Sequence, residues 1–158
     1  MIAKRLIAIA FCLCIANLVF SQQAYFIDGY HGGIWGHYPE KFTSFFIGQM
    51  EKHPDWKVNL EIEPVTWDVV RKNDSAAYHQ LQRYLSEAPE HSRVEIVNPA
   101  YGQSYLYNIS GESIIRQFAY GIRKTREHFP HAVFATYSSE EPCFTSALPQ
   151  ILHGFGFR

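Results

Sequence analysis

The chain has 158 residues, with 14 Lys and Arg side chains against 15 Asp and Glu, and a formal net charge of −1. This balance excludes the large positive field with which proteins recruit nucleic acid or anionic lipid. Hydrophobic residues make up 47% of the chain and charged residues 18%, which excludes a disordered tail and predicts one packed domain or part of one.

The amino terminus has the order of a secretory signal peptide. Lys4 and Arg5 precede an apolar run that ends at Phe20, and the small residue Ser21 follows. We expect cleavage after Ser21, so that residues 1–21 are removed and the mature protein is periplasmic or extracellular, without attachment to the membrane. The alternative is an uncleaved anchor, although the run is shorter than the ~20 apolar residues that span a bilayer.

Four β-type runs follow, and apolar residues at helical spacing lie between them. The predicted strands are Ala24–Asp28, Lys57–Glu63, Arg93–Asn98 and Ala132–Tyr137. The apolar helical positions are Phe42, Phe45, Phe46 and Met50 in the first helix, Tyr78, Leu81 and Leu85 in the second, and Ile114, Ile115, Phe118, Ala119 and Ile122 in the third. Ser110 is expected to cap the third helix, which ends near Pro130, and Thr145–Phe155 is the predicted last helix.

This alternating order predicts parallel strands joined by right-handed crossovers, in an open doubly wound sheet or in part of a β/α barrel. Along Lys57–Glu63 the apolar residues alternate with Asn59, Glu61 and Glu63. Helices on both faces of an open sheet would bury that polar face at a cost, whereas a barrel interior that opens into a polar cleft accommodates it. The alternation favours a barrel, with sites on the loops after the carboxyl ends of its strands.

The loop after the first strand combines ligand-type side chains with glycines. Asp28 offers a carboxylate oxygen and His31 an imidazole nitrogen, and both groups bind zinc. Four glycines within residues 29–36 let the backbone approach a ligand closely. A divalent metal site is one interpretation, and a glycine-rich turn with a hydrogen-bonded His31 is the other.

Two later loops offer groups that bind sugar hydroxyls. Glu63, before Pro64 at the end of the second strand, is a candidate substrate-binding residue, with a surface carboxylate as the alternative. The loop after the third strand contains Tyr101, Tyr105 and Tyr107, and tyrosine supplies both the ring face and the hydroxyl that a sugar contacts. Tyr101 is the candidate closest to the strand.

Adjacent carboxylates, Glu140 and Glu141, follow the fourth strand. At this edge of a parallel sheet they either perform chemistry or lie at the start of the next helix, whose dipole favours acidic residues. Cys143 is the only cysteine left once the signal peptide is removed, so no internal disulfide is expected.

Two segments resemble the N-terminal catalytic region of glycoside hydrolase family 38, the α-mannosidases, and particularly its divergent bacterial members. Val94–Lys124 (VEIVNPAYGQSYLYNISGESIIRQFAYGIRK) is similar to the end of the family's third strand and the helix start that follows. Glu140–Phe157 (EEPCFTSALPQILHGFGF) is similar to the segment that carries the nucleophile. Because the family's fold is a seven-stranded β/α barrel, the resemblance implies that residues 22–158 form its first half, about four β/α units.

The resemblance also implies a nucleophile and, in the motif of the first strand, a sugar-binding aromatic residue, which is Trp35 in this chain. The family's nucleophile is an aspartate, and Glu141, or less well Glu140, stands in that place here. The family's first-strand motif is His, any residue, Asp, two residues, Trp. In this chain His31 and Trp35 are four apart and Gly33 stands where a carboxylate would be.

In the implied site, Asp28, His31 and Glu141 hold a divalent cation, usually zinc in the family. Trp35, Glu63 and Tyr101 bind the substrate, and Glu141 or Glu140 is the catalytic carboxylate. The implied reaction is retaining hydrolysis of terminal α-mannosides in oligosaccharides or glycans.

The general acid and a further histidine ligand of the family lie beyond Arg158, so the chain alone is expected to be inactive. Two alternatives remain: a non-catalytic carbohydrate-binding remnant, and a barrel like that of the metal-dependent polysaccharide deacetylases. The deacetylases' Asp-Asp pair and His-x-x-x-His motif are absent from this sequence.

Overall fold

The structure is a computed structural model that describes residues 25–28, 38–88, 91–102, 104–139 and 144–157, the first of these ranges by its backbone. Its sheet contains β1 (Tyr25–Asp28), β2 (Lys57–Leu60) and β3 (Val94–Ile96) in the order β1-β2-β3. Both strand pairs are parallel, as the sequence predicts. The predicted signal peptide, residues 1–21, lies outside the described residues.

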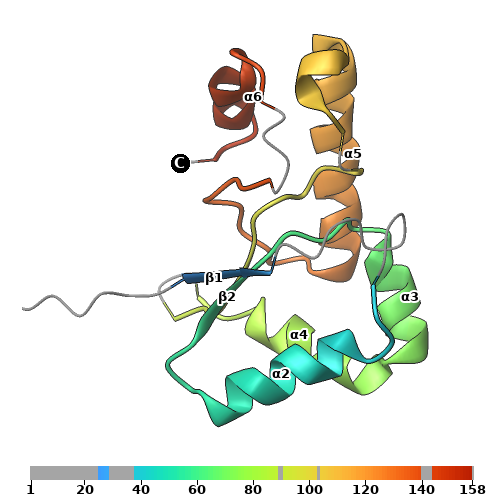
Figure 1. Ribbon diagram of the computed structural model, residues 1–158, viewed down its shortest axis with the longest axis vertical. Coiled ribbons are helices and arrows are strands. Elements are labelled where there is room, and N and C mark those ends of the chain that lie inside the picture. The colour runs from blue at the N-terminus through green and yellow to red at the C-terminus, as the bar shows by residue number, and fades with distance from the viewer. Residues whose placement is uncertain (1–24, 29–37, 89–90, 103, 140–143, 158) are drawn as a thin grey trace, which may run out of the picture.

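Helices connect the strands and follow the last one. They are α2 (Phe42–Lys52), α3 (Thr66–Asn73), α4 (Ser75–Tyr84), the short 3₁₀ helix η1 (Leu106–Asn108), α5 (Gly111–His128) and α6 (Leu148–Gly154). Figure 1 shows α2 and α4 side by side beneath the sheet, with α5 and α6 toward the top of the view. None of the helices in the described part of the chain is long and apolar enough to cross a membrane.

The predicted helices are confirmed in position, although their ends differ. Ser110 caps α5 as expected, because its Oγ accepts a hydrogen bond from the backbone N–H of Ser113 at 3.2 Å. The last helix is shorter than predicted and begins at Leu148. Helix α3 was not predicted from the sequence, since its run of Thr, Trp and Val has low helix propensity. Its formation is driven by burial of Trp67, which is fully enclosed.

The predicted fourth strand, Ala132–Tyr137, is wrong, because that segment forms no strand. Instead, the backbone N–H groups of Ala135 and Thr136 donate to Oε1 of Glu95 at 3.2 and 2.7 Å. A side-chain carboxylate thus accepts the hydrogen bonds that strand carbonyls would accept in a ladder. The segment still runs beside β3, since Ser138 N–H donates to a carbonyl just after that strand at 3.1 Å.

The described residues form a mixed α/β unit with an open three-stranded parallel sheet. The predicted α/β class and parallel strands are confirmed. No closed barrel is seen within the ranges that the structure describes, so the first half of a seven-stranded barrel stays a prediction.

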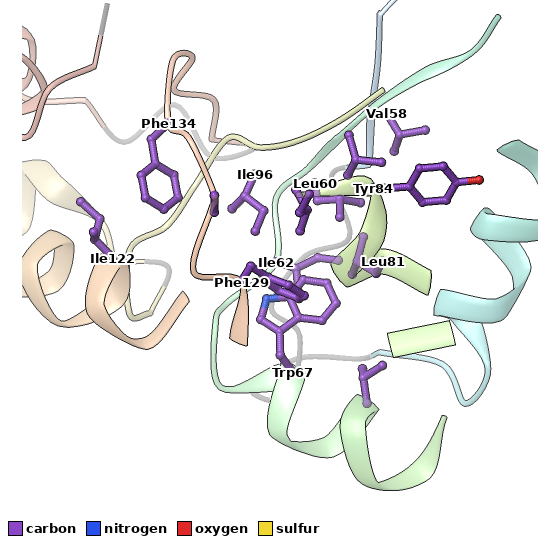
Figure 2. Close-up of a cluster of buried hydrophobic side chains, with 14 of the residues drawn as sticks. Val58, Leu60, Ile62, Trp67, Leu81, Tyr84, Ile96, Ile122, Phe129 and Phe134 are labelled. Atoms are coloured by element: carbon purple, nitrogen blue, oxygen red, sulfur yellow. The ribbon is translucent and has the colours of Figure 1, made fainter. Parts of the chain in front are cut away.

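One hydrophobic core joins the sheet to the helices. Register pairs Leu60 with Ile96, and both side chains are buried on the same face. Figure 2 shows the indole of Trp67 beside the ring of Phe129, with centroids 5.4 Å apart and an interplanar angle of 79°. This edge-to-face contact ties α3 to the end of α5. Because the core also holds Leu60 of β2, it fixes the sheet relative to both helices.

Candidate functional site

The carboxyl ends of the strands meet at one edge of the sheet, where sites form in parallel α/β folds. Register places the Cα of Asp28 beside Leu60, and Leu60 beside Ile96. The row continues past the strands, because Val97 N–H donates to the Leu60 carbonyl at 3.0 Å and Ser138 N–H donates to the Val97 carbonyl at 3.1 Å. Four chain segments therefore end side by side at this edge.

The second of these segments carries two buried carboxylates. Glu61 is 1% and Glu63 2% exposed, so the alternative that Glu63 is a surface carboxylate is wrong. Carboxylates are rarely so deeply buried, because removing a charge from water costs several kcal/mol unless partners compensate. Glu63 also begins the turn into α3, where its carbonyl accepts the N–H of Thr66 at 3.0 Å.

Asn98, at the end of the third segment, joins this group. Its Nδ2 lies 3.5 Å from Oε1 of Glu61, and its Oδ1 accepts the N–H of Ala100 at 3.2 Å. Asn98 is itself 4% exposed. Sequence reasoning did not select Glu61 or Asn98 as site residues, although the polar alternation along the second strand and the strand-ending Asn-Pro pair both signalled them.

Tyr101 is held at this edge through its backbone. Its N–H donates to the carbonyl of Gln117 in α5 at 3.0 Å, and the next N–H, of Gly102, donates to Oε1 of the same glutamine at 2.9 Å. The side chain of Tyr101 is 39% exposed. The loop is thus fixed while the ring remains accessible, which suits the predicted substrate contact.

The other predicted site residues divide into two groups. The backbone of Asp28 ends β1 at the same edge as Glu63. His31, Trp35, Glu140 and Glu141 lie outside the described residues. The structure describes Ser138 and Ser139, which directly precede Glu140, at the end of the row.

The structure does not test the metal ligands predicted from the sequence, because His31 and Glu141 lie outside the described residues. Within the described part of the chain, no group of three or more His, Cys, Asp or Glu side chains is arranged to hold a metal ion. The predicted set of Asp28, His31 and Glu141 still has the right chemistry, because carboxylate oxygen and imidazole nitrogen are ordinary zinc ligands.

A cavity of about 220 Å³ lies at the opposite ends of the strands. Its lining includes Lys57, Arg93 and His131, which precede or begin the strands and the segment after α5. The guanidinium of Arg93 is occupied there by the carbonyls of Met50 and Pro54, at 3.1 and 2.9 Å. Since parallel sheets place their sites at the carboxyl ends of strands, this cavity is not the candidate site.

Comparison with known proteins identifies the family. No curated protein and no solved structure matches the chain. The sequence model described as the Glycosyl hydrolases family 38 N-terminal domain matches residues 38–158, which is more than half of the chain and includes β2, β3 and every segment of the candidate edge except β1. The chain therefore belongs to glycosyl hydrolase family 38, as the two similar segments at residues 94–124 and 140–157 predict.

Proposed function

We propose that this protein carries the first part of an α-mannosidase-type active site, which hydrolyses terminal α-mannosides with retention of configuration. The observation that carries the proposal is the family match over residues 38–158, because it spans every segment that ends at the candidate edge except β1. The buried carboxylates beside the strand ends support it, since a glycosidase needs charged oxygens in a sheltered cleft.

In the proposed mechanism Glu141 is the nucleophile. Its carboxylate attacks the anomeric carbon, the bond to the leaving oxygen breaks as a second carboxylic acid protonates that oxygen, and a glycosyl ester forms on the enzyme. Water then attacks the anomeric carbon from the face that the leaving group vacated, opposite the ester, so that two inversions give net retention. Glu140 is the second candidate for this role.

The residues proposed to bind the sugar are Trp35, Glu63 and Tyr101. A carboxylate such as that of Glu63 accepts hydrogen bonds from sugar hydroxyls, and aromatic rings cover the apolar face of the pyranose. Asp28, His31 and Glu141 would hold a divalent cation, with zinc as the first choice. When bound, the cation supplies Lewis-acid contacts to the substrate hydroxyls.

A covalent trap tests the nucleophile without requiring a general acid. 5-Fluoro-α-mannosyl fluoride carries fluoride as a leaving group that departs without protonation, and the ring fluorine slows hydrolysis of the ester. After incubation with zinc and proteolysis, we expect the peptide that contains Glu140 and Glu141 to gain one fluorosugar. Fragmentation of that peptide distinguishes the two glutamates, and Glu141→Gln should abolish the label.

The control variant is Glu51→Gln, on the exposed side of α2, which should label like the wild type. Label on a different carboxylate would move the nucleophile, and absence of any label would reject the catalytic proposal. The non-catalytic carbohydrate-binding alternative predicts that last result together with retained binding of mannosides. The family match gives no support to the deacetylase alternative.

A further inference from the structure

The loop between β3 and α5 displays two aromatic rings that no role proposed above uses. Tyr105 is 50% and Tyr107 67% exposed, on either side of the buried Leu106. Their ring centroids lie 6.0 Å apart and the ring planes are inclined by 59°. The rings therefore do not cover each other face to face, and each has surface available to a third ring.

The backbone under these rings is fixed at several points. Leu106, only 3% exposed, anchors the 3₁₀ helix η1 in the core, and Asn108 N–H donates to the Tyr105 carbonyl at 2.9 Å. Ser110 then begins α5 with its side-chain cap. Exposed rings on a fixed backbone lose little conformational entropy on binding, which is the condition for a preorganised contact surface.

The composition of the loop indicates the chemistry of its ligand. Residues 98–110 contain no charged side chain, and beside the two tyrosines Ser104 adds a hydroxyl group and the exposed Asn108 an amide. A neutral surface of rings, amides and hydroxyls matches a neutral polyhydroxylated ligand, whereas a phosphate or a charged peptide would find no charged side chain in this loop to pair with. The loop also follows directly from Tyr101 at the candidate edge.

We infer that Tyr105 and Tyr107 form an accessory subsite on which a sugar unit beyond the terminal mannose of an oligosaccharide stacks. The inference rests on the proposed function, because it extends that site along the substrate toward the leaving group. It assigns the pair to recognition of chain length and not to the chemical step.

Binding of short and long ligands tests the subsite. Dissociation constants of methyl α-mannoside and of an α-linked mannotriose are measured by titration calorimetry for the wild type, Tyr105→Ala, Tyr107→Ala and Tyr107→Phe. We expect each alanine variant to weaken mannotriose binding by about tenfold and to leave methyl α-mannoside binding unchanged, whereas Tyr107→Phe retains most of the affinity. Both rings are half or more exposed, so the variants are expected to fold.

Tyr120→Ala is the matched control, because this ring on α5 is 46% exposed and lies under the Arg123 guanidinium, outside the loop. Mannotriose binding that is unchanged in both alanine variants, or a wild type that binds no mannotriose, would overturn the subsite. If the two tyrosine-to-alanine variants lose affinity for mannotriose but not for methyl α-mannoside, and the mannosyl fluoride leaves no covalent label, the subsite is supported while the catalytic proposal is rejected. The two failures are therefore distinguishable.

Discussion

The hydroxyl of Tyr78 lies 2.9 Å from Nδ1 of His128 in the interior between α4 and α5. The other ring nitrogen, Nε2, lies 3.3 Å from a carboxylate oxygen of Asp68 in α3, and Lys124 contacts the same carboxylate at 2.9 Å. Gln82 closes the group by donating to the His128 carbonyl at 2.8 Å. These contacts join the three helices α3, α4 and α5.

This group predicts a loss of stability on acidification. Burial is the largest influence and lowers the pKa of His128 below its ordinary 6.5, with the positive charges of Lys124 and Arg71 acting in the same direction, while Asp68 and Glu127 oppose it. As the pH falls below 6.5, the His128 imidazole therefore takes up a proton more readily in the unfolded chain than in the folded protein. The free energy of unfolding should therefore be highest above pH 6.5 and should fall as the pH drops below it, by at most about 1.4 kcal/mol per pH unit.

Urea unfolding between pH 7.5 and 5.0 measures this effect. In His128→Leu the decline over that range should disappear, while stability at pH 7.5 falls by about 1–3 kcal/mol, because the Tyr78 hydroxyl loses its bond to the imidazole and keeps only the Gln82 amide, at 3.3 Å. The exposed His153→Gln is the control and should behave like the wild type. A decline of the same size in His128→Leu would contradict the assignment of the pH dependence to His128.

Asp68 does not contribute to the decline in this range. Burial raises the pKa of its carboxyl, but Lys124, His128 and Arg71 outweigh that effect and hold the pKa below its ordinary 3.8.

The contact of α5 with the loop after β3 predicts that Gly121→Ala destabilises the protein. A Cβ at this position would lie 2.5 Å from the backbone nitrogen of Tyr101 and would overlap the carbonyl of Pro99. Because these are backbone atoms, the helix or the loop must move, and we expect a loss of about 1–3 kcal/mol. Gly48→Ala in α2, where the added carbon meets nothing, should instead gain up to about 1 kcal/mol.

Thermal and urea unfolding of the two alanine variants give the comparison directly. If Gly121→Ala were as stable as Gly48→Ala, the close approach of α5 to the loop would be refuted. Gly121→Ala should also weaken mannoside binding, since the loop that it displaces carries Tyr101.

The carboxylate of Glu95 predicts how the segment before Glu140 is held. Glu95→Ala removes the acceptor of both the Ala135 and the Thr136 N–H groups. We expect these two amides to exchange their hydrogens faster and stability to fall by about 1–3 kcal/mol. Glu95→Gln keeps an oxygen acceptor and should retain most of the protection. Equal exchange rates in the wild type and Glu95→Ala would show that the backbone does not depend on this side chain.

Local patterns in the sequence predict only part of this fold. The spacing of Ile114, Phe118 and Ile122, together with the Ser110 cap, determines α5 because both signals act within one helix. The segment after α5 has a strand-like alternation of buried Ala132 and Phe134 with exposed neighbours. Two of its backbone N–H groups, those of Ala135 and Thr136, nevertheless donate to the Glu95 side chain of β3, which no local pattern encodes.

The candidate edge shows the same division. Alternation along the second strand separates Glu61 and Glu63 from the apolar face, but it does not reveal that both carboxylates are buried. Glu61 meets its partner Asn98, which lies 37 residues later in the chain, only through the parallel register. Helix α3 was missed for a related reason, because its stability comes from the contact of Trp67 with Phe129.

The donor set proposed for the metal predicts zinc binding that depends on the first strand. Equilibrium dialysis followed by metal analysis should find about one zinc ion per chain, and Asp28→Asn or His31→Ala should lower the affinity by at least about tenfold, as expected when a ligand is removed. Cys143→Ser is tested in parallel, because a free thiolate also binds zinc. Zinc affinity that survives Asp28→Asn and His31→Ala but falls in Cys143→Ser would place the ion elsewhere.

The control variant is His131→Gln, whose exposed side chain lies at the opposite ends of the strands and which should leave zinc binding unchanged. Loss in the two first-strand variants alone would mean that the loop after β1 reaches the same edge as Glu63 and Asn98, since that is where the register ends β1.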